Sequence, residues 1–272
     1  MKVPFRQPLL ALAAWATGLL SAPSGEASAL IDNLNAGKDQ TLVLYGTSLT
    51  QYGRWADLEP GHGGLSDWLA GLYGSRITVI NSGMAGLASN SGVANLGSKV
   101  LDFHPDTVLI EFAINDAHTN YTSGQVDFNI SLEQSKANLN TMIDSIWADN
   151  PQAEIILLTM NPAFDIAHYL SGTYRPELEA YYQGYRDVAA QRGIQLIDLY
   201  ANWVELRETD PSLYATYFPD GLHPTAPGSL AIALPALKEA LLIPEASSLV
   251  FFLSGVALLG AGILRNSPGL NE

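Results

Sequence analysis

The chain has 272 residues, of which 47% are hydrophobic and 15% are charged, and its formal net charge is −14. This length is enough for one packed domain of roughly 200 residues with additional segments at the ends, and the composition excludes a mainly disordered chain. The negative charge argues against a nucleic-acid partner, because the phosphates would be repelled. Since the sequence contains no cysteine, disulfides, thiolate catalysis and cysteine metal sites are excluded.

Residues 1–29 have the features of a secretory signal peptide. Lys2 and Arg6 form a basic start, Leu9–Leu20 is apolar and uncharged, and Ala27-Ser28-Ala29 fits a small-residue cleavage site. We therefore expect the protein to be exported, and we expect its folded domain to begin at residue 30.

Residues 30–242 combine the patterns of strands and helices. Five apolar runs rich in β-branched residues predict buried strands at Thr41–Tyr45, Ile77–Ile80, Thr107–Phe112, Glu154–Thr159 and Gln195–Leu199. Helical patterns follow or separate them at Leu65–Tyr73, Val93–Phe103, Ser131–Asp149, Pro176–Gln191 and Pro227–Leu241. Such alternation predicts a parallel sheet covered on both faces, which is a three-layer α/β/α sandwich with five strands. No charged or proline-rich linker divides this region, so it is expected to form one domain.

Polar residues stand directly after three of the predicted strands. Ser48 follows the first strand, Asn81-Ser82-Gly83 follows the second and Asn115 follows the third. Functional groups gather beyond the carboxyl ends of parallel strands, so these residues are expected at one edge of the sheet. A serine nucleophile also needs a base and a carboxylate that orients the base. His223 and Asp220, in the late segment Asp220-Gly221-Leu222-His223, are the candidates for these two roles.

Four sequence blocks together carry a family resemblance. They are Gly46-Thr47-Ser48-Leu49, Asn81-Ser82-Gly83-Met84-Ala85-Gly86, Ala113-Ile114-Asn115-Asp116 and Asp220-Gly221-Leu222-His223. In this order they resemble the blocks of the SGNH hydrolases, the GDSL esterase/lipase superfamily. The resemblance implies a flavodoxin-like SGNH hydrolase fold and the catalytic residues Ser48, Asp220 and His223. It also implies an oxyanion hole formed by the N–H groups of Ser48 and Gly83 and the side-chain amide of Asn115.

Two positions depart from the usual SGNH pattern. Thr47 stands where the family usually has aspartate, and Ala113 stands where it usually has glycine. Neither change removes a reacting group, but the hydrogen bonding around the serine must differ.

Other enzyme motifs are absent from the sequence. There is no Gly-x-Ser-x-Gly elbow, no phosphate-binding loop and no dinucleotide fingerprint, and the remaining histidines lack the spacing of metal ligands. We therefore expect no cofactor and no metal. Several polar and aromatic residues near the four blocks are expected either to line the site or to have structural roles: Tyr52, Trp55, Asp116, His118 and Tyr121.

The C-terminal residues 243–272 contain a second hydrophobic run. Ser247–Leu264 has 18 uncharged residues, near the lower limit for a membrane span, and Arg265 follows it. Together with Pro244-Glu245 this pattern resembles a PEP-CTERM sorting signal, although Ala246 replaces the usual second proline and Arg265 stands alone. The resemblance implies that a C-terminal helix enters the membrane and that a sorting enzyme removes the tail, which leaves the protein anchored at the bacterial surface or released from it.

The expected function is that of a serine esterase with an acyl-serine intermediate. The sorting-like tail suggests an O-acetylated extracellular polysaccharide as substrate, and lipid, aryl and thioesters are equally compatible with the catalytic residues. One alternative is an O-acyltransferase that uses the same acyl-enzyme. Another is a non-catalytic, surface-anchored carbohydrate-binding protein on an SGNH scaffold, an alternative that the departures at Thr47 and Ala113 keep open.

Overall fold

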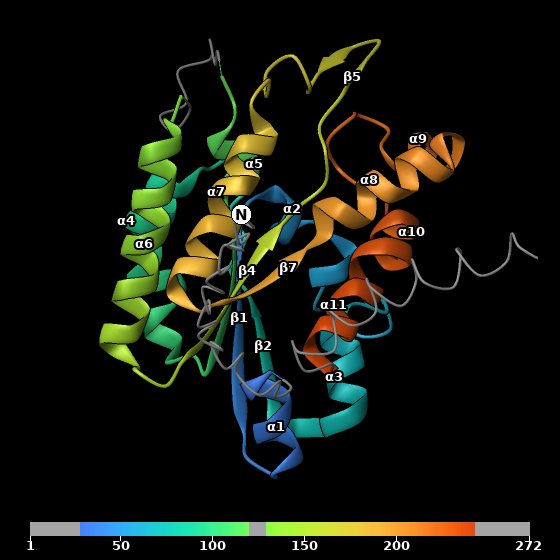
Figure 1. Ribbon diagram of the computed structural model, residues 1–272. Coiled ribbons are helices and arrows are strands. Elements are labelled where there is room, and N and C mark those ends of the chain that lie inside the picture. Colours follow the sequence, from blue (N-terminus) through green and yellow to red (C-terminus); the bar gives the residue numbers. More distant parts are fainter. Residues whose placement is uncertain (1–27, 120–128, 243–272) are drawn as a thin grey trace, which may run out of the picture.

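The computed structural model describes residues 28–119 and 129–242, and its centre is a five-stranded parallel sheet (Figure 1). The strands lie in the order β2-β1-β3-β4-β7, with all neighbours parallel. Their bounds are β1 Gln40–Gly46, β2 Ile77–Asn81, β3 Thr107–Glu111, β4 Glu154–Thr159 and β7 Gln195–Asp198. Each corresponds to a predicted strand, so the predicted five-stranded parallel sheet is confirmed.

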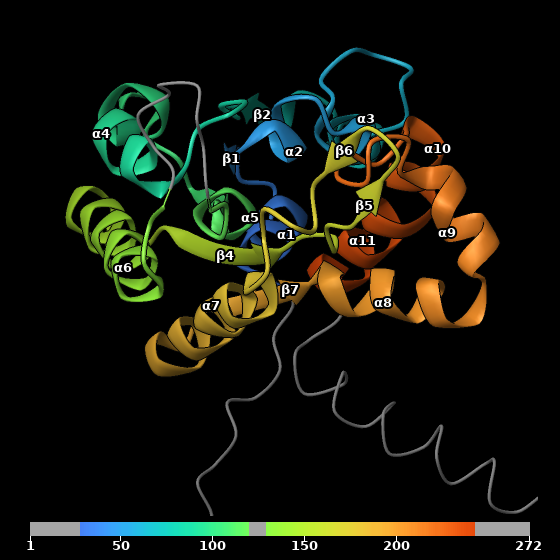
Figure 2. The same cartoon turned by 90° about the horizontal axis from the view of Figure 1, so that it is seen from above.

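Helices cover both faces of this sheet (Figure 2). One face carries α4 Ser89–Lys99, α6 Leu132–Asp149 and α7 Leu178–Arg192. The other carries α1 Ala29–Asn35, α3 Leu65–Tyr73, α8 Leu199–Thr209 and α11 Leu234–Leu242. Because both faces are covered, the three central strands β1, β3 and β4 are buried along most of their length, and Leu42–Tyr45 of β1 is fully inaccessible to solvent. The predicted three-layer α/β/α architecture is confirmed.

Two predicted helices have different bounds in the structure. The helix predicted at Val93–Phe103 begins earlier, at Ser89, because the carboxylate of Asp116 accepts a hydrogen bond of 2.8 Å from the Ser89 N–H. It ends at Lys99 and is followed by a 3₁₀ turn, Leu101–Phe103. The helix predicted at Pro227–Leu241 is divided into α10 Ala226–Gly228, a π turn Ser229–Ala233 and α11.

Several short elements had no signal in the sequence pattern. They are α2 Ser48–Gln51, α5 Ala113–Asp116, α9 Pro211–Tyr217, the 3₁₀ turns Arg54–Ala56 and Gly74–Arg76, and a two-stranded hairpin of β5 Asp165–Ile166 and β6 Tyr169–Leu170. Helices α1 and α8 were also not predicted. The short elements α2 and α5 and the hairpin lie beyond the carboxyl ends of the strands (Figure 1).

The described residues begin at Ser28, two residues before the domain start expected from the sequence. The Ser28 hydroxyl caps α1, and the Ser28 N–H donates to the carbonyl oxygen of Leu241 at 3.4 Å. The N–H of Ala29 donates to the Glu154 carboxylate at 2.7 Å. The rest of the predicted signal peptide, residues 1–27, and the predicted tail, residues 243–272, lie outside the described residues.

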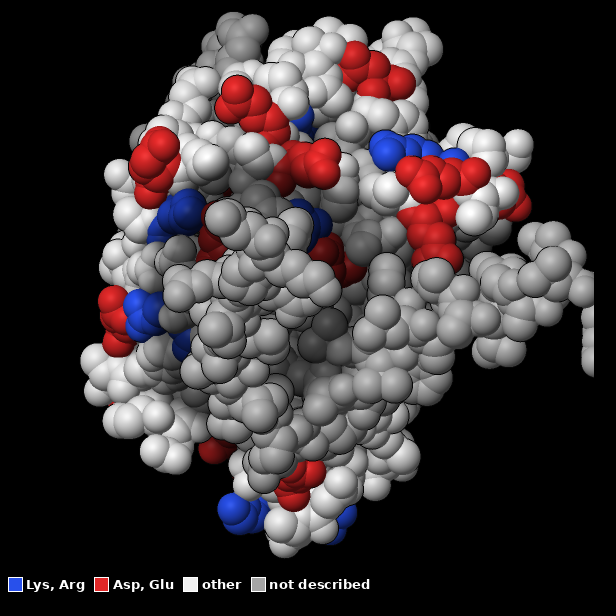
Figure 3. Space-filling view, in the orientation of Figure 1, with Lys and Arg blue, Asp and Glu red and all other residues white. Residues whose placement is uncertain are grey.

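Within the described ranges, no helix combines the length and the apolar character needed to cross a membrane. The predicted span Ser247–Leu264 falls in the undescribed C-terminal residues. On the face that Figure 3 shows, acidic and basic side chains of described residues are interspersed.

Candidate active site

Ser48 lies where the central strand β1 turns into the short helix α2. Thr47 separates the strand from the helix, and its hydroxyl accepts a hydrogen bond of 3.2 Å from the Leu49 N–H as the N-cap. Ser48 is the first residue of α2, and only 8% of it is exposed. The Ser48 hydroxyl therefore lies beyond the carboxyl end of β1, where the sequence predicts it.

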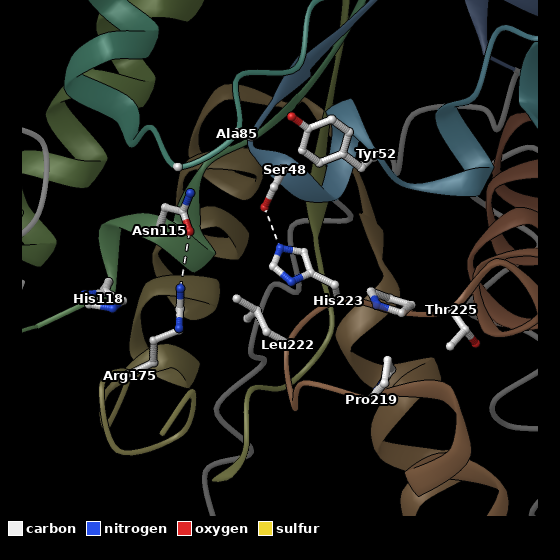
Figure 4. A pocket seen from close by; sticks show the side chains of 12 residues that line it. Ser48, Tyr52, Ala85, Asn115, His118, Arg175, Pro219, Leu222, His223 and Thr225 are labelled. Carbon is white, nitrogen blue, oxygen red and sulfur yellow. Dashed lines mark hydrogen bonds between the residues drawn. The ribbon is translucent and has the colours of Figure 1, made fainter. Parts of the chain in front are cut away.

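Folding brings Ser48, His223 and Asp220 into one hydrogen-bonded series, of which Figure 4 shows the contact between Ser48 and His223. The Ser48 Oγ lies 2.8 Å from His223 Nε2, and His223 Nδ1 lies 2.6 Å from Asp220 Oδ2. The second carboxylate oxygen of Asp220 accepts the backbone N–H groups of Leu222 at 2.9 Å and His223 at 2.7 Å. The serine and histidine are 175 positions apart in the sequence, so only the fold can explain their contact.

The surroundings of Asp220 favour its ionised form. Burial alone would raise the pKa of this carboxyl, but hydrogen bonds from the backbone and ring of His223 and from the Leu222 backbone outweigh burial and lower the pKa below its usual range. An ionised Asp220 can hold a proton on His223 Nδ1, which leaves Nε2 as the acceptor facing Ser48.

The loop that carries Asp220 and His223 is held by the segment after β4. Three consecutive carbonyl oxygens of the loop each accept one hydrogen bond from that segment. Ser171 Oγ donates to Asp220 O at 3.0 Å, Phe164 N to Gly221 O at 3.0 Å, and Asn161 Nδ2 to Leu222 O at 2.7 Å. The loop geometry that joins the carboxylate to the imidazole is thus fixed from outside the loop as well as within it.

Thr47 has a partner that explains how it replaces the usual aspartate. Its N–H and hydroxyl lie 2.6 and 2.9 Å from Glu111 Oε1, and the Thr50 hydroxyl donates to the same oxygen at 2.7 Å. Burial raises the pKa of Glu111 to about 7, although the hydrogen bonds from Thr50 and Thr47 oppose this shift. Gly46 is required beside this carboxyl, because a Cβ there would overlap Glu111 Oε1. The turn before Ser48 is therefore fixed by a buried carboxyl at the end of β3.

Asn115 lies in α5, at the end of β3, and is 4% exposed. Its Nδ2 donates to the carbonyl oxygen of Leu87 at 2.9 Å, and its Oδ1 accepts from Arg175 Nη2 at 3.4 Å. A carbonyl oxygen can only accept and a guanidinium can only donate, so the two neighbours agree on the orientation of the amide. The second hydrogen of Nδ2 remains for another acceptor.

Ser48, Asn115 and His223 share one cavity of about 600 Å³. Its remaining wall is mainly apolar, with Leu222 and the prolines Pro219 and Pro224 beside the histidine, and Tyr52 also lines it (Figure 4). Such a cavity, apolar with a few convergent polar groups, is typical of a site for a small organic ligand.

The structure does not bring Gly83 into this cavity. Its N–H donates to Asn81 Oδ1 at 3.0 Å, and a Cβ on Gly83 would overlap the backbone of Gln51. The oxyanion-hole role expected for Gly83 is therefore not supported by the geometry. Gly86, three residues further along the same sequence block, lines the cavity instead with a φ of 72°.

The N–H groups of Gly86 and Ser48 make no hydrogen bond to any described residue. Together with Asn115 Nδ2 they form a set of three donors at the cavity. The glycine pair in Asn81–Gly86 is the sequence signal that could have indicated this, since either glycine allows a close backbone approach.

The aromatic candidates near the blocks have different positions. Tyr52 lines the cavity and is 71% exposed. Trp55 is buried in the core, where its Nε1 donates to Leu49 O at 3.0 Å, so its role is structural. Tyr121 lies outside the described residues.

Asp116 and His118 follow Asn115 but differ in role. The two carboxylate oxygens of Asp116 accept from the Ser89 N–H and from the Ser135 hydroxyl, so this residue ties α4 and α6 to α5. His118 lines the cavity, and burial together with the charge of Arg175 lowers its pKa to about 4. His118 is therefore uncharged at neutral pH. Among the residues that the structure describes, no cluster of three possible metal ligands occurs.

Arg175 also lines the cavity, and nothing in the sequence indicated that it belongs to the site. It stands between β6 and α7, 60 positions from the Asn115 side chain that it contacts, and it is 8% exposed. Only the packing of the segment after β4 onto α5 brings the two together.

The sequence matches the model of the GDSL-like lipase/acylhydrolase family over residues 44–231. No curated protein matches it. Similar solved structures include a putative GDSL-like lipase from Parabacteroides merdae, with 19% identity, a TM-score of 0.62, and coverage of 75% of this chain and 96% of that one. The acetylxylan esterase Axe2 from Geobacillus stearothermophilus shares 22% identity, with a TM-score of 0.59 and coverage of 75% and 94%.

A lipase/acylhydrolase from Enterococcus faecalis shares 27% identity, with a TM-score of 0.54 and coverage of 74% of this chain and 95% of that one. The likeness to these proteins extends over nearly the whole of each of them.

Proposed function

The chain belongs to the GDSL-like lipase/acylhydrolase family, and from this premise we propose that it hydrolyses carboxylic esters through an acyl-Ser48 intermediate. One observation carries the proposal, namely the contact of 2.8 Å between Ser48 Oγ and His223 Nε2, which continues at 2.6 Å from His223 Nδ1 to Asp220. A serine hydroxyl is a weak nucleophile at neutral pH, and this arrangement supplies the base that activates it.

In the first half of the reaction, His223 Nε2 takes the hydroxyl proton of Ser48 while Oγ attacks the ester carbonyl carbon. Negative charge develops on the carbonyl oxygen, and we assign its stabilisation to the N–H groups of Ser48 and Gly86 and to Asn115 Nδ2. The imidazolium then gives its proton to the departing alcohol oxygen. Asp220 stays ionised throughout and stabilises the positive charge on His223.

In the second half, water attacks the carbonyl carbon of the acyl-serine. His223 takes a proton from this water, and the same three donors hold the oxyanion. When the bond to Ser48 Oγ breaks, His223 returns the proton to the serine. The products are a carboxylic acid and the regenerated enzyme.

For the substrate, we propose acetyl esters on an extracellular glycan. The similar enzyme from Geobacillus stearothermophilus acts on acetylated xylan, and its catalytic variants replace a serine, an aspartate and a histidine. In the present chain the exposed ring of Tyr52 beside the catalytic cavity offers an apolar face of the kind on which sugar rings stack. The expected export of the protein would bring it to such a polymer.

Export and surface attachment are themselves part of the proposal. They rest on the sequence of residues 1–29 and 243–272. The test is fractionation of cells that produce the full-length chain. Retention in the membrane fraction that is lost when residues 244–272 are deleted supports the anchor, and a fully soluble full-length protein contradicts it.

The central test is labelling with a fluorophosphonate probe, which reacts with activated serines. We expect labelling of the wild type, none of Ser48→Ala and unchanged labelling of the control Ser145→Ala on α6. Folded wild-type protein that takes no label would favour the non-catalytic carbohydrate-binding alternative. Release of acid from p-nitrophenyl acetate without an added acceptor separates an esterase from an acyltransferase. A panel of acetylated glycans, long-chain esters and aryl esters then identifies the substrate class.

A further inference from the structure

Arg175 is a buried cation in the wall of the catalytic cavity. Its Nε donates to Ile114 O at 2.7 Å, its Nη1 to Ser171 O at 3.3 Å and its Nη2 to Asn115 Oδ1 at 3.4 Å. All three acceptors are neutral oxygens. Burial lowers the pKa of Arg175 to about 10, an effect that the negative charge of Asp220 opposes, so the guanidinium still carries its charge at neutral pH.

The contact with Asn115 bears on the oxyanion site. Asn115 serves the reaction only when an Nδ2 hydrogen faces the carbonyl oxygen of the ester. Leu87 O accepts a hydrogen bond from Nδ2 at one edge of the amide. Arg175 donates to Oδ1 at the opposite edge, as Figure 4 shows. A charged donor on Oδ1 also withdraws electron density from the amide, which makes the Nδ2 hydrogens better donors.

The charge of Arg175 matters most in the transition state. The ester is neutral when it binds, and its carbonyl oxygen becomes negative only as Ser48 attacks. A fixed positive charge behind Asn115, in a site of low exposure, therefore stabilises the transition state more than the bound ester. His118, which also lines the cavity, is uncharged at neutral pH, so it does not supply this charge.

Arg175 also connects the oxyanion site to the loop that carries the Asp220 carboxylate. Its Nη1 holds the carbonyl oxygen of Ser171, and the Ser171 hydroxyl donates to the carbonyl oxygen of Asp220 at 3.0 Å. A single segment, residues 171–175, thus contacts both Asn115 and the loop of Asp220 and His223.

We propose that Arg175 is a positioning residue of ester hydrolysis, which fixes and polarises the Asn115 amide at the oxyanion site. The proposal rests on the acyl-serine chemistry proposed above. It predicts that Arg175 acts on turnover through Asn115 and contributes little to substrate binding.

The test is a double-mutant cycle with p-nitrophenyl acetate as substrate. Arg175→Met and Arg175→Lys are made in the wild type and in Asn115→Ala, and kcat and KM are measured for each. We expect Arg175→Met to lower kcat roughly 10- to 100-fold in the wild type, with KM changed less than about threefold. In the Asn115→Ala background the same substitution should lower kcat by less than about threefold, because the group it acts through is gone.

Lysine keeps the positive charge but cannot reproduce the planar arrangement of the three guanidinium hydrogen bonds. Arg175→Lys should therefore retain part of the kcat that Arg175→Met loses. The matched control is Arg192→Met, at the far end of α7, where the arginine contacts α6 and should not affect kcat. Folding of each variant is checked by circular dichroism and thermal unfolding. If Arg175→Met does not fold, the double-mutant cycle is measured with Arg175→Lys, alone and combined with Asn115→Ala.

Equal losses of kcat in both backgrounds would overturn the proposal. A change confined to KM would also overturn the proposal. If KM changed only for esters that bear a carboxylate, Arg175 would instead be a binding site for a substrate anion. Wild-type protein without any Ser48-dependent turnover would overturn the proposed function and this inference together. Ser48-dependent turnover by the wild type, together with equal effects of the Arg175 substitution on kcat in the two backgrounds, would overturn this inference alone.

Discussion

Gly221 lies so close to the carbonyl oxygen of Phe164 that a side chain at this position would overlap that oxygen. Gly221 also has a φ of 72°, a backbone conformation that favours glycine. It stands between Asp220 and His223, so the contact ties the path of the catalytic loop to the segment after β4. The close approach leaves no freedom for a larger residue unless the loop moves.

The first prediction concerns this contact. Gly221→Ala should lower kcat/KM by more than about tenfold, because the Cβ displaces the loop and small errors in catalytic geometry are costly. The measurement is steady-state kinetics combined with thermal unfolding. The matched control is Gly193→Ala, which has a φ of 63° but open space around it, and should cost about 1 kcal/mol of stability with unchanged kcat. Full activity of Gly221→Ala would show that the loop tolerates the displacement.

The second prediction concerns the pH dependence of stability at Glu111. Its pKa is about 7 in the folded protein, against an ordinary value of 4.5. Between these values the unfolded chain loses its proton while the folded protein keeps it, so this carboxyl makes the folded state less favourable as the pH rises. The loss amounts to about 3 kcal/mol and is complete above pH 7.

Glu111→Gln removes this titration and keeps an oxygen for Thr47 and Thr50. Urea unfolding of both proteins at pH 5 and pH 8 should show the variant gaining stability relative to the wild type as the pH rises. Glu239→Gln, at an exposed position on α11, is the control that should show no such gain. A constant difference between wild type and Glu111→Gln at the two pH values would contradict the shifted pKa.

The third prediction concerns the orientation of the imidazole. Asp220→Asn should lower kcat by about 10,000-fold, since an amide can donate to His223 Nδ1 and so favours the wrong tautomer. KM should change much less. Thermal unfolding serves to show that the loop, which also uses the side chain of Asp220 as a backbone acceptor, remains folded.

The fourth prediction separates the two asparagines near the oxyanion site. Asn115→Ala should lower kcat by about 100- to 1000-fold, because one donor to the oxyanion is lost. Asn81→Ala removes hydrogen bonds to Thr50 O and Ala56 O, both of 2.9 Å, and should reduce stability while kcat stays within a few-fold. If Asn81→Ala costs as much kcat as Asn115→Ala, then Gly83 and its partner belong to the oxyanion site after all.

The fifth prediction concerns Tyr52 and the substrate class. Tyr52→Ala should raise KM for an acetylated oligosaccharide several-fold and leave KM for p-nitrophenyl acetate nearly unchanged, because only the larger substrate reaches the exposed ring. Tyr169→Ala is the control, since Tyr169 is also exposed, at 54%, but does not line the cavity. Equal effects on both substrates would place the ring against the acyl group instead.

The sheet could be predicted because its central strands, β1, β3 and β4, are buried on both faces. Leu42–Tyr45 reads as an uninterrupted apolar run, and such a run has few other interpretations when helical patterns follow it. Ser48, Asp220 and His223 could be proposed as a group because their chemistry is interdependent, and because Ser48 stands at the end of a predicted strand. The resemblance of the four sequence blocks to the SGNH hydrolases supported the same three residues.

The same reasoning could not decide whether Gly83 or Gly86 contributes its N–H to the oxyanion site. Both glycines lie in one block, and the difference arises from the Asn81 side chain, which engages the Gly83 N–H. The role of Arg175 could not be predicted from the sequence for a related reason. Its partner Asn115 is 60 positions away, and the segment between β4 and α7 has no periodic pattern. Likewise, the start of α4 at Ser89 depends on the distant carboxylate of Asp116.

The positions of the two domain ends have a consequence for any attached form of the protein. Ser28 is hydrogen-bonded to Leu241, and Gln195, the first residue of β7, reaches Ala240, so both ends leave the domain beside the strand starts. The cavity residues Ser48 and Asn115 belong to α2 and α5, which lie beyond the opposite, carboxyl ends of the strands (Figure 1). A chain held at a cell surface through residues 243–272 would therefore present its cavity outward, away from its own lipids and toward the surrounding material.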